Sequence, residues 1–357
     1  MRGVEPIRLE LIDDFNPPRP PSAAPPAAAG AAWDAALGGL SGLYYSESER
    51  LLYAVTDDPR RFPPRLYTFA VQLSERELEV EPRSVVLLHE LKSSSLLTEV
   101  DCEALSSDGA QGLLIATEGN DQSAQRESRI LQVSKQGLVS GPRVAIPEAL
   151  LPEAGAASLR GARSNRGFEG IAVSPSGRWL YAILEESLRQ DGPDANLEQG
   201  ADVRLLRWDL HSAAAPIQFF YRTEALSPKP PPGVVARGNN GVSDLVALDD
   251  GRLLALERGF VTPDGGAGIN TIRLFEVEVP ARVTPGDASL PRVSKRLVLD
   301  LNDVIPRLEP GLQTLDNFEG MTLGPRLPSG VRSLLLVSDD NFGARQRTVF
   351  LAFALRG

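Results

Sequence analysis

The sequence has few residues for thiol or imidazole chemistry, with one cysteine and two histidines among its 357 residues. A single cysteine excludes an intrachain disulfide and a cysteine-rich metal site, and it fits a reducing compartment. The cysteine, Cys102, directly precedes Glu103. Because a neighbouring negative charge raises the pKa of a thiol, we expect Cys102 to be a packed, inert thiol and not a nucleophile.

Long apolar runs are also missing from the sequence. Apolar stretches such as 334–337 fall far short of the roughly 18 residues that a membrane helix requires, so no membrane partner is expected. The N-terminal segment MRGVEPIRLELIDDF is interrupted by charges and offers no apolar region of a signal peptide. We therefore expect a cytoplasmic location for the chain as written, and a secreted or periplasmic one if the true start lies upstream.

Basic residues are outnumbered, with 37 Lys and Arg against 47 Asp and Glu and a formal net charge of −10. Such a chain lacks the electrostatic attraction that drives non-specific binding to nucleic acids or anionic lipids, so no nucleic-acid partner is expected. The sequence is instead rich in turn formers, with 32 glycines and 29 prolines. These residues disfavour helices and suit short strands joined by turns, which indicates an all-β protein.

Two short segments precede the main body of the chain. Residues 7–12 are typical of a short strand, whereas the sequence NPPRPPSAAPPAAAG at 16–30 has no periodicity and is typical of an irregular tether. We assign a closing strand to residues 1–15, a Pro/Ala-rich tether to 16–32 and one folded domain to 33–357.

One pattern recurs five times in this domain: a Ser or an acid beside a small residue, an apolar strand, a polar turn, and a second apolar strand that ends in acids. The copies align at Ser41, Glu103, Glu169, Ser243 and Glu319, with spacings of 62, 66, 74 and 76 residues. Each spacing leaves room for two further strands, such as those expected at 65–73 and 129–133.

Repeated four-stranded sheets without intervening helices are typical of a β-propeller, because radial closure protects the sheet edges. The repeat count predicts five blades, or six if a diverged blade lies in the long segments between hairpins. The last repeat is short of strands, so we expect the strand at 7–12 to complete it and close the ring.

The recurring acids are predicted to gather at one end of the ring. In an antiparallel hairpin the start of the first strand lies beside the end of the second, so each motif residue meets terminal acids. The expected sets are Ser41 with Asp57 and Asp58; Glu103 with Glu118 and Asp121; Glu169 with Glu185 and Glu186; Asp244 with Glu257 and Arg258; and Glu319 with Asp339, Asp340 and Asn341.

A ring of carboxylates offers the hard oxygen ligands that Ca²⁺ or Mg²⁺ requires. We predict a divalent cation, with Ca²⁺ favoured over Mg²⁺, held by Glu103, Glu319, Asp339 and Asp340. Turn formation is the alternative explanation, because Asp and Asn are common at strand ends. However, Glu is a poor turn residue, and it occurs three times at one register.

Two arginines accompany these acids: Arg166, just before the Gly167–Glu169 segment, and Arg258, just after Glu257. They are candidates to bind a phosphate or carboxylate, or alternatively to pair with the neighbouring acids. Serine or cysteine hydrolase chemistry is disfavoured, because both histidines, His89 and His211, fall in segments expected to be outer strands.

Five phrases carry a family resemblance: GGLSGL at 38–43, NRGFEG at 165–170, LLALERGF at 253–260, DNFEGM at 316–321 and LLLVSDDNF at 334–342. In this order they resemble the phytase-like family described as having esterase-like activity of phytase, from about residue 38 to the C-terminus. The resemblance implies a propeller-like domain and a hydrolase of phosphate or carboxylic esters, and it carries over no catalytic residue.

Two hypotheses follow. In the first, the protein is a metal-assisted hydrolase of small phosphate or carboxylic esters, with Glu169 as the base and with Arg166 and Arg258 holding the anionic group. In the second, it is a non-catalytic propeller that binds a ligand or a protein, and any Ca²⁺ is structural. The polar segment 187–202 would serve as a lid in the first case and as a docking loop in the second.

Overall fold

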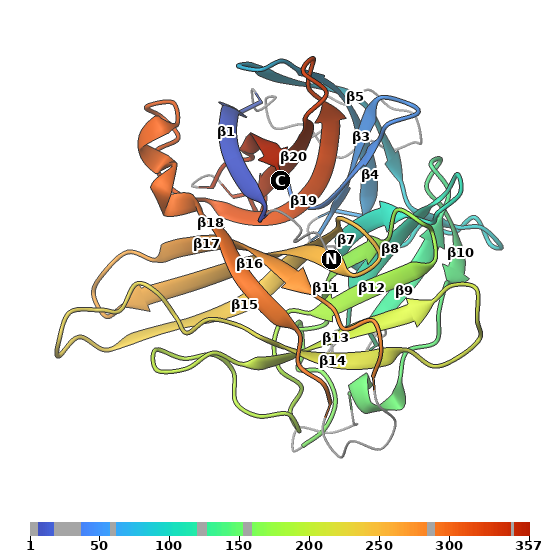
Figure 1. Ribbon diagram of the computed structural model, residues 1–357. Coiled ribbons are helices and arrows are strands. Elements are labelled where there is room, and N and C mark those ends of the chain that lie inside the picture. Colours follow the sequence, from blue (N-terminus) through green and yellow to red (C-terminus); the bar gives the residue numbers. More distant parts are fainter. Residues whose placement is uncertain are drawn as a thin grey trace.

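Five antiparallel sheets surround a common axis in the structure, a computed structural model that describes residues 6–17, 37–57, 62–119, 127–152, 159–283, 290–343 and 346–357. The colours of Figure 1 follow the chain from sheet to sheet around the ring. Each innermost strand contacts the innermost strands of both neighbouring sheets, so the ring is closed. The prediction of a five-bladed propeller is confirmed, because every strand in the described residues belongs to one of these five sheets.

The blades are numbered in chain order, and each runs outward from the axis. The innermost strands are β2 (Leu40–Ser46), β7 (Asp101–Ser107), β11 (Phe168–Val173), β15 (Ala236–Ala247) and β19 (Asn317–Arg326). The second strands are β3 (Leu51–Thr56), β8 (Leu113–Glu118), β12 (Trp179–Leu184), β16 (Arg252–Pro263) and β20 (Arg332–Asp339). The third strands are β4 (Arg65–Leu73), β9 (Arg129–Val133), β13 (Asp202–Asp209), β17 (Ile269–Glu278) and β21 (Phe350–Arg356).

The outermost strands are β5 (Leu78–Leu87), β10 (Leu138–Pro142), β14 (Ile217–Arg222), β18 (Ser294–Asp300) and β1 (Arg8–Phe15). The short β6 (His89–Glu90) adds a fifth, parallel strand to blade two. Helical structure in the described residues is limited to three short 3₁₀ segments, η1 (Glu148–Leu150), η2 (Leu301–Asp303) and η3 (Ile305–Arg307). None of the helices described is long and apolar enough to cross a membrane, and the cellular location stays a prediction.

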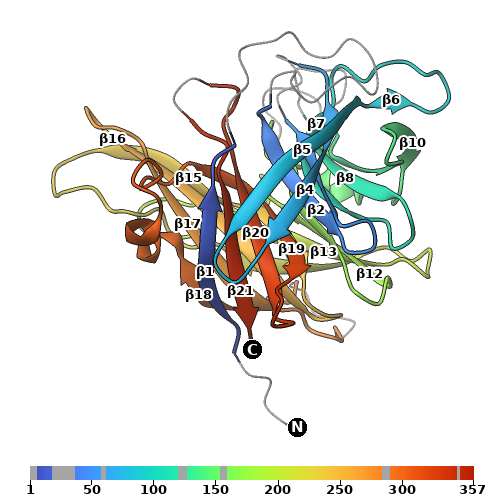
Figure 2. The same cartoon turned by 90° about the horizontal axis from the view of Figure 1, so that it is seen from above.

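Blade five contains strands from both ends of the chain. Strand β1 pairs antiparallel with β21, from Arg8 opposite Arg356 to Phe15 opposite Phe350, and Figure 2 shows the two strands side by side. The strand expected at 7–12 corresponds to the first part of β1. Apart from residues 16 and 17, the tether expected at 16–32 lies outside the described residues.

The hydrophobic core lies between the faces of neighbouring blades. Between blades five and one, for example, Phe69 and Phe350 pack edge to face with ring centroids 5.8 Å apart. Because both faces of each blade are covered, the second strands are apolar almost throughout, as in LLIATE of β8 and WLYAIL of β12. The polar groups of these strands are consequently concentrated at the strand ends.

Each innermost strand has a register shift at the residue by which the sequence repeats align. The shifts fall at Ser41, Glu103, Glu169, Ser243 and Glu319. A β-bulge leaves one residue unpaired and turns its side chain away from the regular alternation. The five repeats therefore share a backbone irregularity as well as a sequence pattern, at the end of the ring where the acids gather.

A glycine or an alanine follows four of the five bulges, where the innermost strands converge. A Cβ atom on Gly42 would lie 2.7 Å from the Cα of Ala104 in the next blade. We expect Gly42→Ala to lower the free energy of unfolding by about 1–3 kcal/mol, since the backbone of blade two must shift. Gly311→Ala is the control, because nothing lies within 4 Å of a Cβ there. Equal midpoints of urea unfolding for the two variants would contradict this explanation.

Candidate active site

A pocket of about 340 Å³ opens at the bulged end of the ring and is lined almost entirely by polar side chains. Every blade contributes to it. The lining residues are Asp57, Asp101, Glu103, Asn165, Arg166, Glu169, Glu185, Arg258, Phe260, Asn270, Asn317, Glu319, Asn341 and Gln346. Five of the residues predicted from the sequence are thus brought together: Glu103, Arg166, Glu169, Arg258 and Glu319.

The bulge residues divide into two kinds according to their side chains. The glutamates Glu103, Glu169 and Glu319 line the pocket, although each is at most 8% exposed. The serines instead bind backbone carbonyls of the neighbouring blade: Ser41 donates to Cys102 at 2.6 Å, and Ser243 donates to Phe318 at 3.4 Å. The serines therefore join adjacent blades, whereas the glutamates supply the carboxyl groups of the pocket.

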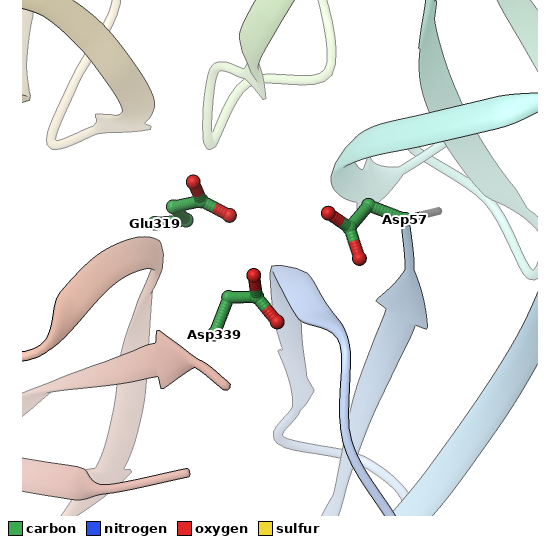
Figure 3. A group of neighbouring side chains, drawn as sticks. All are labelled: Asp57, Glu319 and Asp339. Carbon is green, nitrogen blue, oxygen red and sulfur yellow. The ribbon is translucent and has the colours of Figure 1, made fainter. Parts of the chain in front are cut away.

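One group of carboxylates lies between blades five and one. Carboxylate oxygens of Asp57, Glu319 and Asp339 are within 4.8 Å of one another, and Figure 3 shows the three side chains turned toward a common space. The amide of Asn317 donates to Glu319 at 2.8 Å and thereby orients it. Asp339 is fully buried, and its Oδ2 has no hydrogen-bond partner among the described residues.

A second collection of carboxylates lies in blades two and three. Asp101, Glu103 and Glu118 form one group with oxygens within 4.8 Å, and Glu118, Glu169 and Glu185 form another. Asp101 and Glu118 are opposite each other on β7 and β8. Oε1 of Glu118 accepts the backbone N–H of Gly167 at 2.8 Å, whereas its Oε2 has no hydrogen-bond partner in the described part of the chain. Glu118 therefore connects the two groups.

Burial and mutual repulsion make these carboxyl groups weak acids. Burial, followed by the charge of Glu185, raises the pKa of Glu118 to about 8. The pKa of Glu169 is raised by burial and then by Glu118 and Glu185, and that of Glu103 by burial and then by Glu169. Without a cation, the site consequently retains protons on some of these groups at neutral pH.

The same features fit a divalent cation. Carboxylate oxygens at this spacing can share one ion, and the buried oxygens Oε2 of Glu118 and Oδ2 of Asp339 have no protein hydrogen bond to lose. A cation would supply the positive charge that favours ionised carboxylates over protonated ones. Oxygen-only ligands are typical of Ca²⁺ or Mg²⁺ sites and are unlike the nitrogen and sulfur ligands that dominate zinc sites.

The two arginines line the pocket and contact acids of both carboxylate collections. Arg166 is 3.0 Å from Glu185 and 3.1 Å from Glu186. Arg258 lies between blades, with its Nη2 3.3 Å from Glu185 and 3.4 Å from Glu319. Both arginines thus pair with neighbouring acids, which was the alternative role considered for them. The Nε of Arg258 has no hydrogen-bond partner among the described residues.

Two of the predicted metal ligands, Asp339 and Asp340, do not line the pocket. Asp339 belongs to the group in Figure 3, whereas Asp340 lies in none of the carboxylate groups found among the described residues. Oδ1 of Asp340 accepts backbone N–H groups from Gly39 and Phe342, both at 3.0 Å. These bonds hold the turn after β20 against the start of blade one. Asp58 and Asp121 lie outside the described residues.

Some residues of the site were not chosen from the sequence. Asp101 and Asn317 each precede a bulge glutamate by two residues, and each lines the pocket together with that glutamate. That spacing was the available signal for them. Phe260 ends the phrase LLALERGF, but nothing in the sequence marked it as a site residue, and Asn270, near the start of β17, is marked by no repeat.

Other features considered in the sequence lie apart from the pocket. Cys102 is fully buried. Burial is the main cause that raises the pKa of its thiol, and the negative charge of Asp101 adds to this effect. Neither histidine is among the described residues that line the pocket. The segment 187–202 is anchored to the body of blade three, because Asp191 pairs with Arg204 at 2.5 Å and Leu188 is fully buried.

Comparisons with known proteins give a family match and similar solved structures. No curated protein matches the sequence. Among solved structures, a Pseudomonas aeruginosa periplasmic gluconolactonase, PpgL, has 16% identity and a TM-score of 0.36, with 90% of this chain and 89% of that chain covered. Citrobacter koseri AztD has 13% identity and a TM-score of 0.25, with 83% and 69% covered.

The family comparison covers most of the chain. The family described as phytase-like, with esterase-like activity of phytase, matches residues 35–342. The match includes all five innermost strands and the carboxylate groups of the pocket. The chain therefore belongs to the phytase-like family.

Proposed function

We propose that the protein is a cation-assisted hydrolase of small phosphate or carboxylic esters and that the acidic pocket is its active site. The family description supports a hydrolase-type propeller with a small-molecule ester substrate. The observation that carries the proposal is the convergence of three carboxylate groups on one pocket that also contains two arginines. Negative charge develops on an ester oxygen in the transition state of hydrolysis, and a cation or an arginine beside that oxygen stabilises it.

Two separate sets of carboxylate oxygens could each supply ligands for a cation. Glu319 and Asp339, together with Asp57, offer one set of oxygens, and Glu103 offers another with Asp101 and Glu118. Ca²⁺ is the proposed ion, because six to eight flexible oxygen ligands suit it better than the strict octahedron of Mg²⁺. When bound, such an ion polarises an ester oxygen and lowers the pKa of water. We assign Asp340 a supporting role, because it holds the turn that directly follows Asp339.

Glu169 is the proposed general base. It lies on a bulge and lines the pocket together with Glu103, Arg166 and Arg258. This position allows it to accept a proton from water directed at the substrate. Arg166 and the unbonded Nε of Arg258 are suitably charged to hold the anionic part of the substrate or of the transition state.

Hydrolysis of p-nitrophenyl phosphate and p-nitrophenyl butyrate tests the proposal. The purified protein would be assayed with Ca²⁺, with Mg²⁺ and with EDTA. We expect hydrolysis of at least one ester that EDTA abolishes and Ca²⁺ restores. Glu319→Gln should lower the Ca²⁺ affinity at least tenfold, because one ligand charge is lost. Glu81→Gln, on the exposed outer strand β5, is the control.

The alternative, a non-catalytic propeller with structural Ca²⁺, makes a different prediction for the same samples. In that case neither ester would be hydrolysed, while Ca²⁺ would still raise the melting temperature. Activity that is unaffected by EDTA would contradict cation assistance. Full cation-dependent activity in both Glu169→Gln and Glu319→Gln would overturn the assignment of the site.

A further inference from the structure

Phe260 is an exposed aromatic residue at the rim of an otherwise polar pocket. It is the only residue with an apolar side chain among the described residues that line the pocket, and it remains 36% exposed. The other lining residues include six carboxyl groups and two arginines, with amides making up the rest. A solitary exposed ring at such a boundary is well placed to contact the apolar part of a ligand whose polar part lies deeper.

The position of the ring follows from the long first hairpin of blade four. Strands β15 and β16 are 12 residues each, and Figure 1 shows them reaching beyond the ring of blades. Along β16, alternate residues share one face. Leu254 and Leu256 on this face are buried in the core between blades four and five, and Arg258 follows at the pocket wall. Phe260 is the next residue on that face, where the core has ended.

The neighbouring strand fixes the ring in place. Phe260 is opposite Asn270 of β17, whose side-chain amide donates to the carbonyl of Leu315 at 3.2 Å. The ring lies across Gly268, where a Cβ atom would be 2.2 Å from Cζ of Phe260. Glycine therefore leaves the space that the ring occupies. A ring held by its own sheet loses little conformational entropy when a ligand packs on its free face.

We infer that Phe260 is a specificity-determining residue and that the pocket takes an amphipathic ester, with its polar group among the carboxylates and arginines and its apolar group against Phe260. This inference rests on the proposed function. An amphipathic substrate is favoured over a molecule that carries anionic groups at both ends. A second anionic group at the rim would face the aromatic ring of Phe260 and the excess of acidic groups in the pocket.

Binding of two phosphonates tests the inference without requiring hydrolysis. Phenylphosphonate and methylphosphonate share one anionic group and differ in the apolar group. With Ca²⁺ present, isothermal titration calorimetry should show that the wild-type protein binds phenylphosphonate about tenfold more tightly than methylphosphonate. This ratio corresponds to the removal of one ring face from water. Phe260→Ala should reduce this ratio to near one, whereas Phe260→Tyr, which keeps the ring, should retain it.

The control is Ile269→Ala on the same extension of blade four, since Ile269 is exposed and is not among the residues that line the pocket. It should leave the ratio unchanged. An unchanged ratio in Phe260→Ala, equal binding of the two phosphonates by the wild type, or binding of neither would overturn the inference. A Phe260-dependent ratio in a protein that hydrolyses no p-nitrophenyl ester would instead overturn only the proposed function.

Discussion

Glu169→Gln is expected to lower the kcat of ester hydrolysis by about 10²–10⁴-fold, the usual contribution of a general base. Glutamine keeps the size of the side chain and its hydrogen-bonding ability but cannot accept a proton. Glu169 is only 7% exposed, and its backbone is fixed by the bulge in β11, so the substitution should leave the pocket shape unchanged. The expected result is a loss in kcat with little change in KM.

Two further variants separate the loss of a base from the loss of a charge. Arg166→Lys changes a residue that contacts Glu185 and Glu186, and it should act mainly on KM if the arginine binds the anionic part of the substrate. Glu169→Asp retains a carboxylate but withdraws it by one methylene, so partial activity is expected. Equal kcat in wild type and Glu169→Gln, measured with saturating p-nitrophenyl ester and Ca²⁺, would remove Glu169 from the mechanism.

The arrangement of the blades could be predicted from the sequence because the signal is repeated. Each of the five aligned residues is followed by two apolar strands joined by a polar turn. The spacing between the aligned residues leaves room for four strands in each repeat. The aligned residues are the positions of the bulges, although the alignment alone did not show that the backbone is irregular there. Gly42, Gly170 and Gly320 directly follow three of the five aligned residues. A small residue there reflects the convergence of backbones at the axis, which is a property of the closed ring.

Other parts of the site were beyond sequence reasoning because they depend on contacts between blades. The grouping of Asp57 with Glu319 and Asp339 joins the first and last blades, which are separated by most of the chain. The backbone-binding role of Asp340 arises from the close approach of Gly39. Phe260 ends the phrase LLALERGF, but its place at the pocket depends on the pairing of β16 with Asn270 of β17, which no repeat marks.

The stability of the cation-free protein is expected to fall as the pH rises from about 5 to 8. Burial and the charge of Glu185 raise the pKa of Glu118 to about 8 in the folded state, from an ordinary value of 4.5. A carboxyl group with a raised pKa in the folded state contributes stability below its unfolded pKa, and that contribution is lost as the pH rises through the folded pKa. Glu118 therefore contributes a loss of stability over this pH range.

Glu118→Gln tests the origin of this pH dependence. A glutamine stays neutral at every pH, and its Oε1 can still accept the N–H of Gly167. The variant should therefore lose less stability than the wild type between pH 5 and pH 8 in EDTA, with the remaining loss due to Glu103 and Glu169, whose pKa values burial also raises. Glu81→Gln should behave as the wild type does, because Glu81 is exposed. Ca²⁺ should reverse the wild-type trend, since ionised carboxylates bind the cation and protonated ones do not. A wild-type protein that is equally stable at both pH values in EDTA would show that these carboxyl groups ionise in the fold without cost.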